Sequence, residues 1–277
     1  MKLIADSGST KTDWCLTEGG QTVRLMATQG MNPFHMGEGE IYEILTGELR
    51  PQLGGAEPAE VYFYGSGCRD ACLTLMETML RRVFAKAGTV CVGSDLLGAA
   101  RALCARSGGI ACILGTGSNS CLYNGESIVE NTPPLGYILG DEGSGAVLGR
   151  CFAAALLRGL LPQALADAFA KETGLTAAEI IRRVYREPGA NRFLASLTRF
   201  IHRHIDSPEL RRLAIDNFRS FFRLHVAPYR RPDLPVGVIG SVGYYFSAEL
   251  SDAAEAEGIT LGTVERSPLE RLAAYHG

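Results

Sequence analysis

Long apolar segments are missing from this 277-residue chain, and its richest apolar run, Cys151–Leu161, is interrupted by Arg158. A membrane-spanning helix needs about 20 consecutive apolar residues, so no membrane partner is expected. The apolar stretch at the start gives way to Asp6 after a few residues, which is too short for the core of a secretory signal. We therefore expect a cytoplasmic protein.

An excess of charge of one sign is also missing. The chain has 27 Lys+Arg and 30 Asp+Glu, which leaves a net charge of −3. Nucleic-acid-binding surfaces carry clustered positive charge, often with aromatic side chains that stack on bases. The Arg residues between 158 and 231 are instead spread through amphipathic helical patterns without an aromatic platform. No nucleic-acid partner is expected.

Several catalytic and metal-binding signatures do not occur. The sequence has no Gly-Lys dipeptide, and hence no Walker A loop, and it has no G-x-S-x-G or H-E-x-x-H motif. Its eight cysteines include no C-x-x-C pair. A disulfide framework or a metal cluster held by cysteines is therefore not expected.

Glycine, by contrast, is abundant, with 33 residues in the chain against a usual share of about 7%. The glycines cluster after strand-like segments. The pattern predicts, in order, strands 2–5, 13–16 and 23–27, helix 39–50, strand 61–64, helix 72–87, strand 90–92 and helix 95–106. It then predicts strand 110–114, a hairpin of 119–123 with 127–130, helices across 144–231 with a capping box at Thr176 and Glu179, strand 235–239 and helix 244–257. This alternation predicts an α/β fold in two halves.

Two turns of small residues follow strands in different halves. The first, Asp6–Thr12, contains Ser9, Thr10 and Lys11, whose side chains and backbone amides can bind phosphate. Asp6 could hold Mg²⁺ there, mostly through water. The second, Leu114–Ser120, repeats the arrangement. Either turn alone also fits an ordinary hairpin, but together they indicate two walls that bind one polyphosphate.

Three further strand ends carry candidate residues. Asp141 precedes a helix beginning near Ser144, whose N-terminus offers an anion site. Gly240 lies in a strand–turn–helix segment where a flat ring could approach the backbone. Asp95 follows strand 90–92, where its carboxylate could accept the proton of an attacking hydroxyl. The alternatives are an acidic N-cap region, a tight βα turn and an N-cap aspartate, respectively.

Together these motifs resemble the sugar kinase–actin–heat-shock ATPase superfamily, and within it the N-acetylglucosamine kinase and BadF/BadG-type ATPase group. The matching segments occur in family order and cover nearly the whole chain: DSGSTKTDW at 6–14, GMNPF at 30–34, GSD at 93–95, LGTGSNS at 114–120, GYILGDEGSGAVLGR at 136–150 and IGSVGYYF at 239–246. The resemblance implies two ribonuclease-H-like domains with ATP and sugar in the cleft between them. It places them at 1–106, joined by a C-terminal helix at 266–277, and at 107–265.

The resemblance also implies an ATP-dependent kinase that phosphorylates the 6-hydroxyl of N-acetylglucosamine or a related amino sugar. Asp95 would be the base, Asp6 would lie near Mg²⁺, and Ser9, Thr10, Lys11, Thr116 and Gly240 would contact ATP. The residues implied for the sugar are Asn32, Asp95, Ser118, Asn119, Gly136, Tyr137 and Asp141. The Trp common before the GDEGS segment in animal relatives is absent, which leaves the identity of the sugar open.

Two other functions stay open. One is an ATPase that activates or regulates a partner protein, although no counterpart of the cluster-binding cysteine motifs of dehydratase activators is found. The other is a nucleotide-binding scaffold without turnover. A homodimer is also left open.

Overall fold

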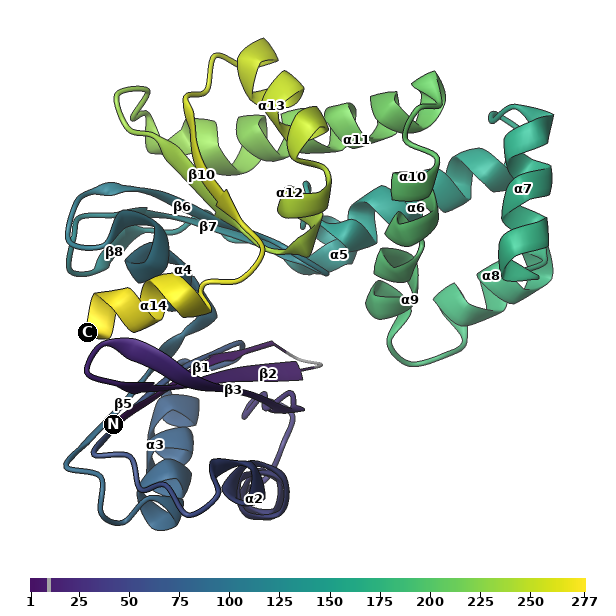
Figure 1. Ribbon diagram of the computed structural model, residues 1–277. Helices are drawn as coiled ribbons and strands as arrows, with labels where there is room; N and C mark the ends of the chain where they lie inside the picture. The colour runs from purple at the N-terminus through teal and green to yellow at the C-terminus, as the bar shows by residue number, and fades with distance from the viewer. Residues whose placement is uncertain (9–10) are drawn as a thin grey trace. The chain divides into compact units, whose positions relative to one another are not determined.

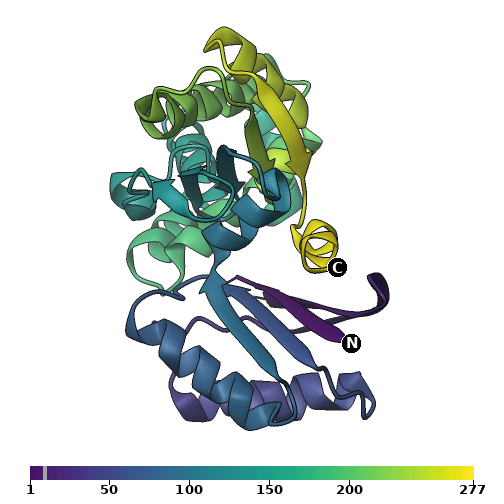
Figure 2. The same cartoon turned by 90° about the vertical axis from the view of Figure 1, so that its left-hand side faces the viewer.

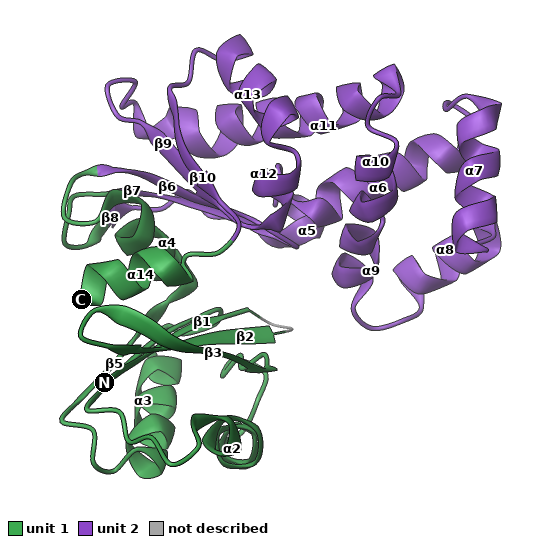
Figure 3. Ribbon diagram, in the orientation of Figure 1, with its two compact units in different colours: residues 1–108, 123–128, 267–277 green, residues 109–122, 129–266 purple. Residues whose placement is uncertain are grey.

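Two five-stranded mixed sheets organise the chain, which is described over residues 1–8 and 11–277 of a computed structural model (Figure 1). Unit 1 comprises residues 1–108, 123–128 and 267–277, and unit 2 comprises residues 109–122 and 129–266 (Figure 3). The predicted α/β class is confirmed. Residues 123–128, expected in the second domain, group with unit 1, where Gly125 packs on the main-chain carbonyl of Arg106.

The sheet of unit 1 has the order β3-β2-β1-β4-β5. Its strands are β1 (Lys2–Ser7), β2 (Lys11–Glu18), β3 (Gln21–Gln29), β4 (Glu60–Gly65) and β5 (Thr89–Ser94). The first three form an antiparallel meander, as predicted, because the connections between them are too short for a crossover. β4 and β5 each follow a helical connection and add in parallel beside β1.

Helices cover both faces of this sheet (Figures 1 and 2). On one face lie α1 (Glu38–Glu43), a π-helical segment (Ile44–Leu49), α2 (Arg50–Leu53) and α3 (Ala71–Val83); on the other lie α4 (Asp95–Cys104) and α14 (Leu269–His276). Successive side chains of a strand point to opposite faces. Leu3, Ile4 and Ala5 of β1 are therefore all fully buried, at 0% exposure.

The sheet of unit 2 has the order β10-β9-β6-β7-β8. Both sheets therefore have the same topology: the first strand of the unit is central, with the second and third strands on one side and the fourth and fifth on the other. Its strands are β6 (Gly109–Leu114), β7 (Ser118–Tyr123), β8 (Ile128–Glu130), β9 (Val236–Ile239) and β10 (Leu261–Glu265). Strand β10 was not predicted. It is an edge strand that is only partly buried, so no apolar run marks it in the sequence.

The helices of unit 2 lie mostly between β8 and β9. They are α5 (Gly136–Leu139), α6 (Gly145–Leu157), α7 (Gln163–Thr173), α8 (Ala177–Tyr185), α9 (Ala190–Ser196), α10 (Thr198–Arg203), α11 (Pro208–Phe221), a π-helical segment (Phe222–Val226) and a 3₁₀ turn (Ala227–Tyr229). The predicted capping box is present at the start of α8. The helix expected over 244–257 is instead two, α12 (Ser241–Tyr245) and α13 (Ser247–Ala256), because Phe246 leaves helical geometry. No helix in the described part of the chain combines the length and the apolar character of a membrane span.

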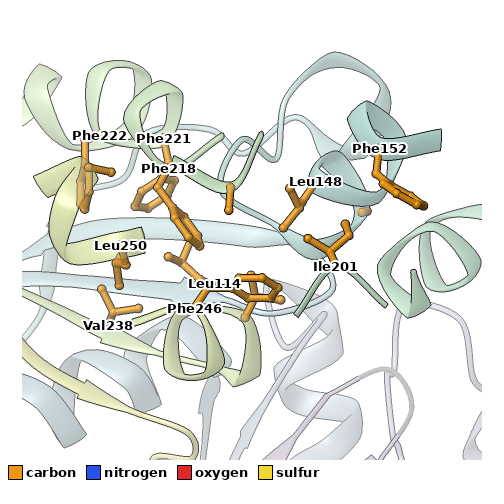
Figure 4. Close-up of a cluster of buried hydrophobic side chains, with 14 of the residues drawn as sticks. Leu114, Leu148, Phe152, Ile201, Phe218, Phe221, Phe222, Val238, Phe246 and Leu250 are labelled. Carbon is orange, nitrogen blue, oxygen red and sulfur yellow. The ribbon is translucent and has the colours of Figure 1, made fainter. Parts of the chain in front are cut away.

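A cluster of phenylalanines joins these helices to the sheet (Figure 4). Phe218 and Phe246 are buried near Leu114 of β6, and Phe152 of the same cluster packs on Phe169 and Phe200. Burying a large apolar side chain stabilises a fold by about 2 kcal/mol. This core therefore fixes the ends of β6 and β9, where two of the glycine-rich turns begin.

Candidate active site

In unit 1 the carboxyl ends of three neighbouring strands lie at one level. Ser7 of β1 pairs with Gly65 of β4, and Gly65 pairs with Ser94 of β5. The residues next to these strand ends therefore meet at one edge of the sheet. Two of the predicted site residues, Asp6 and Asp95, flank Ser7 and Ser94 at this edge.

Ser7 connects this edge to the segment that contains Asn32. Its buried Oγ lies 2.7 Å from Thr12 Oγ1 and accepts a hydrogen bond from the Met31 amide at 3.2 Å. Asn32 Oδ1 in turn accepts the Phe34 amide at 3.0 Å, which holds the side chain in a turn of its own backbone. Asn32 is thereby brought to the same edge of unit 1.

Gly67, just beyond β4, packs directly on the Asn32 side chain. Its φ of +78° lies in the left-handed region, and a Cβ at this position would stand 2.0 Å from Asn32 Oδ1. Glycine is thus required there both by conformation and by space. The sequence reasoning missed this residue, although its place in a Gly-Ser-Gly turn at a strand end was an available signal.

Asp95 occupies the first position of α4. Ser94 caps this helix by accepting the Leu97 amide at 3.1 Å, so Asp95 is not the cap that the alternative interpretation required. Its Oδ1 accepts the Leu96 amide at 2.9 Å. Burial raises the pKa of the Asp95 carboxyl despite this bond. A carboxylate with a raised pKa is a stronger base for accepting a hydroxyl proton.

Asp6 is a second carboxyl of unit 1 with a strongly raised pKa. Burial, and secondarily the charges of Asp95 and Asp13, raise its pKa to about 7. Neighbouring carboxylates destabilise one another's charged forms unless a cation lies among them. Such oxygens are the ligands that Mg²⁺ prefers. No group of three His, Cys, Asp or Glu suited to a metal ion occurs among residues 1–8 and 11–277.

The first phosphate-binding turn is only partly described. Ser9 and Thr10, two of the predicted ATP contacts, lie outside the described residues. The turn is closed by a hydrogen bond from the Gly8 amide to the Lys11 carbonyl at 3.0 Å. Lys11 Nζ forms an exposed ion pair with Asp13 at 2.6 Å. Exposed pairs of this kind contribute at most about 1 kcal/mol, so the lysine remains available to an anionic ligand.

In unit 2 the second glycine-rich turn, Gly115–Gly117, is docked on the start of α6. The amides of Gly145 and Ala146 donate to the carbonyls of Gly115 and Thr116 at 2.8 and 3.1 Å. The expected anion site at this helix N-terminus is therefore wrong, because the first amides of α6 already have partners. Thr116 itself is exposed and can offer its hydroxyl to a phosphate.

Asp141 folds back onto this turn. Its own φ is +56°, and its amide donates to the Pro134 carbonyl at 2.8 Å. Burial raises the pKa of the Asp141 carboxyl to about 6, although it accepts backbone hydrogen bonds from Ser118 and Gly136. The structure thus brings together three of the predicted sugar-binding residues.

The other predicted sugar-binding residues differ in whether their side-chain polar groups already have hydrogen-bond partners. Ser118 is buried and its Oγ has no hydrogen-bond partner among the described residues. An unpaired buried hydroxyl costs about 1–3 kcal/mol, so this atom is the clearest sign of a ligand. Asn119 Oδ1 already accepts from the Ser120 amide and from Asn131 Nδ2, both at 2.9 Å. Tyr137 lies half-buried on α5, against the core of unit 2.

Gly240 joins the end of β9 to the same turn. Its φ is +126°, and a Cβ there would stand 2.4 Å from the Leu114 carbonyl oxygen. Its amide donates to the Glu265 carbonyl at 2.9 Å. Only glycine permits this approach between the ends of β9 and β6, so Gly240 and Thr116 belong to one continuous surface of unit 2.

Two residues behind the Asp141 turn, Asn217 and His225, had no predicted role. Asn217 Oδ1 accepts the Gly143 amide at 3.0 Å and its Nδ2 donates to the Ser144 carbonyl at 3.2 Å. His225 Nε2 lies 2.9 Å from Glu142 Oε2. A signal was present, because Asn217 and His225 lie at helical spacing from the buried Phe221. Polar side chains are uncommon on a buried helix face unless they are hydrogen-bonded to another group of the protein or to a ligand.

Comparison with solved structures relates the chain to proteins of one family. No family model and no curated protein matches the sequence. A crystal structure from Porphyromonas gingivalis, of a protein to which an N-acetylglucosamine kinase function is attributed, is 48% identical and superimposes with a TM-score of 0.97, over 100% of this chain and 98% of that chain.

Two more distant structures share the fold. A Chromobacterium violaceum protein with the same attributed function is 18% identical, with a TM-score of 0.76 over 99% of this chain and 97% of that chain. A ROK-family glucokinase from Streptomyces griseus, in complex with glucose and AMPPNP, is 13% identical, with a TM-score of 0.57 over 99% of this chain and 97% of that one.

Proposed function

Because the chain belongs to the N-acetylglucosamine kinase and BadF/BadG-type ATPase family of the sugar kinase–actin–heat-shock ATPase superfamily, we propose that it phosphorylates the 6-hydroxyl of N-acetylglucosamine or a related amino sugar, with ATP as donor. The observation that carries this proposal is the carboxyl edge of the unit 1 sheet, which carries both the Asn32 segment and Asp95, a carboxyl whose pKa is raised by burial. That edge offers a sugar an amide to bind and a base to react with.

Asp95 acts as the general base in this proposal. As the sugar oxygen bonds to the γ-phosphorus, its proton passes to the Asp95 carboxylate, and the bond from the γ-phosphorus to the bridging oxygen breaks to release ADP. Phosphoryl transfer depends mainly on positioning of the reactants and on stabilisation of charge. The protein therefore needs to supply only one base and several hydrogen-bond donors.

The glycine-rich turns supply the donors for the nucleotide. Thr116 is exposed on a turn whose shape is fixed by α6, and the Gly240 backbone packs closely against the start of that turn. Lys11, with the neighbouring Ser9 and Thr10, would add donors from unit 1. Sugar kinases of this fold use ATP, and these turns are the parts of each unit that suit its phosphates and adenosine.

Each unit offers polar groups suited to a sugar. Asn32 and Asp95 are those of unit 1. In unit 2, Ser118 offers a buried hydroxyl with no partner among the described residues, Asp141 a carboxylate and Asn119 its amide hydrogens. Gly136 and Tyr137 of unit 2 would also contact the sugar. Such a set of fixed polar groups suits a molecule that carries several hydroxyls and an acetamido group.

Mg²⁺ fits the acidic edge of unit 1. Asp6 would hold the ion, mostly through water, with Asp95 and Asp13 contributing negative charge. When bound, the ion neutralises charge on the phosphates. Burial is the main cause of the raised pKa of Asp6, and the charges of Asp95 and Asp13 add to it.

The test is ADP release from the purified full chain with ATP, Mg²⁺ and a panel of amino and neutral hexoses. We expect the fastest turnover with an acetamido sugar, and transfer of labelled phosphate from ATP to its 6-hydroxyl. ATP hydrolysis that is indifferent to every hexose would instead indicate an ATPase acting on a partner protein. ATP binding without ADP release would indicate a scaffold.

Ser118→Ala should separate ligand binding from stability. The variant loses a hydrogen bond to the sugar, so the KM for the sugar should rise about tenfold, which corresponds to ~1.4 kcal/mol. The Tm without ligand should stay the same or rise, because the replaced hydroxyl has no partner. Ser127→Ala, an exposed serine in the 123–128 turn, is the control. A fall in Tm with an unchanged KM would contradict a role for Ser118 in the sugar site.

A further inference from the structure

Two buried polar side chains support the Asp141 turn from behind. Asn217 of α11 is 6% exposed and His225 of the following π-helical segment is 3% exposed. Burial of polar groups is unfavourable unless they are hydrogen-bonded. Asn217 bonds to the main chain at Gly143 and Ser144, and His225 bonds to the side chain of Glu142. Each of the three turn residues after Asp141 is thus bonded to α11 or to the π-helical segment that continues it.

The His225 ring is held in a single place. It stacks on Phe221, with ring centroids 5.1 Å apart and planes at 19°. The His225 carbonyl accepts hydrogen bonds from Ser120 Oγ at 3.1 Å and from Thr132 Oγ1 at 3.0 Å. The ring and the backbone of His225 are therefore each held by contacts of their own. The ring can thus hold the Glu142 side chain in one place through the Nε2 hydrogen bond.

The protonation of this ring follows from its partners. Nε2 lies 2.9 Å from Glu142 Oε2, whereas Nδ1 is buried and has no hydrogen-bond partner in the part of the chain that is described. A buried N–H without an acceptor is more unfavourable than a buried lone pair. The proton therefore belongs on Nε2, which donates it to the Glu142 carboxylate.

We propose that the His225–Glu142 pair is a positioning device for the sugar site. It rests on the proposed function, because the residue that it positions is Asp141. Asp141 adopts a φ of +56°, a conformation that is uncommon for a non-glycine residue and is maintained here by the surrounding hydrogen bonds. The pair fixes the next residue in the chain and so keeps the Asp141 carboxylate against Ser118 and Gly136. His225 itself touches no substrate.

The test compares three variants by steady-state kinetics with N-acetylglucosamine and ATP. His225→Phe keeps a ring on Phe221 but removes the donor, and should raise the KM for the sugar about tenfold with kcat changed less than about threefold. His225→Gln places an amide nitrogen where Nε2 was and should restore the KM to within about threefold. Glu142→Ala should match His225→Phe, and the double variant should be no worse than either, because both remove one interaction.

A matched control is available in the same unit. His204 Nε2 lies 2.6 Å from Glu172 Oε1, and its ring packs on Phe200 at 4.3 Å, so it forms a similar pair on an exposed helical surface. His204→Phe should leave both kinetic parameters unchanged. If His225→Phe affects the KM no more than His204→Phe does, or if Gln rescues nothing, the positioning role is overturned.

A measurement without substrate separates this proposal from the proposed function. If the wild-type chain phosphorylates no amino sugar, the function fails while the pair can still be tested. Nitrogen-15 NMR of the histidine-labelled chain should then show a proton on Nε2 of His225. Hydrogen exchange of the Gly143 and Ser144 amides should accelerate at least about tenfold in His225→Phe. Equal exchange rates in variant and wild type overturn the positioning role, whatever the chain phosphorylates.

Discussion

Asp95→Asn should reduce kcat for sugar phosphorylation by about 10²–10⁴, the usual contribution of a general base. The amide has the same size as the carboxylate and its Oδ1 can still accept the Leu96 amide, so α4 should keep its start. The predicted donors to ATP lie elsewhere, so the Kd for ATP should change less than about threefold. Steady-state ADP release and calorimetric ATP titration measure these two quantities.

Asp70→Asn is the matched control for this substitution. Asp70 is an exposed aspartate of unit 1 whose side chain forms no cap hydrogen bond, and asparagine has the same size. We expect full activity from this variant. Near-full activity of Asp95→Asn as well would show that the base has been assigned to the wrong residue, and an equal loss in both would point to damage to unit 1.

Asp6→Asn should make the protein more stable at pH 8 and nearly inactive. The folded-state pKa of Asp6 is raised from 3.8 to about 7, so between these pH values the folded state binds more protons than the unfolded state. Stability is then lost as the pH rises through about 7. Asparagine does not titrate, so the free energy of unfolding of the variant does not fall in this way as the pH rises. After a discount for partial exposure, the gain at pH 8 should be about 2 kcal/mol, and it should vanish near pH 4.

Activity should fall in the same variant by about 10²-fold or more, because a neutral amide holds Mg²⁺ and its water less well than a carboxylate. Urea unfolding at pH 4 and pH 8, and ADP release against Mg²⁺ concentration, measure the two effects. Asp233→Asn is the control, since the Arg231 hydrogen bond lowers the pKa of Asp233 and no gain at pH 8 is expected. A less stable Asp6→Asn at pH 8 would contradict the electrostatic account.

Local sequence patterns predicted most of the fold. The meander over β1–β3 follows from connections too short for a crossover, and the helical region over 144–231 follows from apolar residues at helical spacing. The pattern failed at β10, where a partly buried edge strand has no apolar run, and at Phe246, where one expected helix is two. In both cases packing against neighbouring elements overrode a weak local signal.

The candidate site was predictable where its chemistry is carried by short motifs. Asp95 and Asp141 follow strands or precede helices, and glycine turns mark where backbone must approach something closely. Asn217 and His225 were missed because their partners are about 70 to 80 residues away in the chain. No local sequence pattern predicts which distant turn a buried polar side chain will be hydrogen-bonded to.

The sequence by itself determined the α/β class, the strand-end turns and the residue types in them, because these depend on periodicity and on backbone freedom that neighbouring residues set. The tertiary structure decided which groups have partners. It shows that the first amides of α6 are occupied, that Ser118 has no partner among the described residues, and that burial raises the pKa values of Asp6, Asp95 and Asp141. Hydrogen-bond pairing and desolvation depend on distances between residues far apart in the chain, and only the folded arrangement fixes those distances.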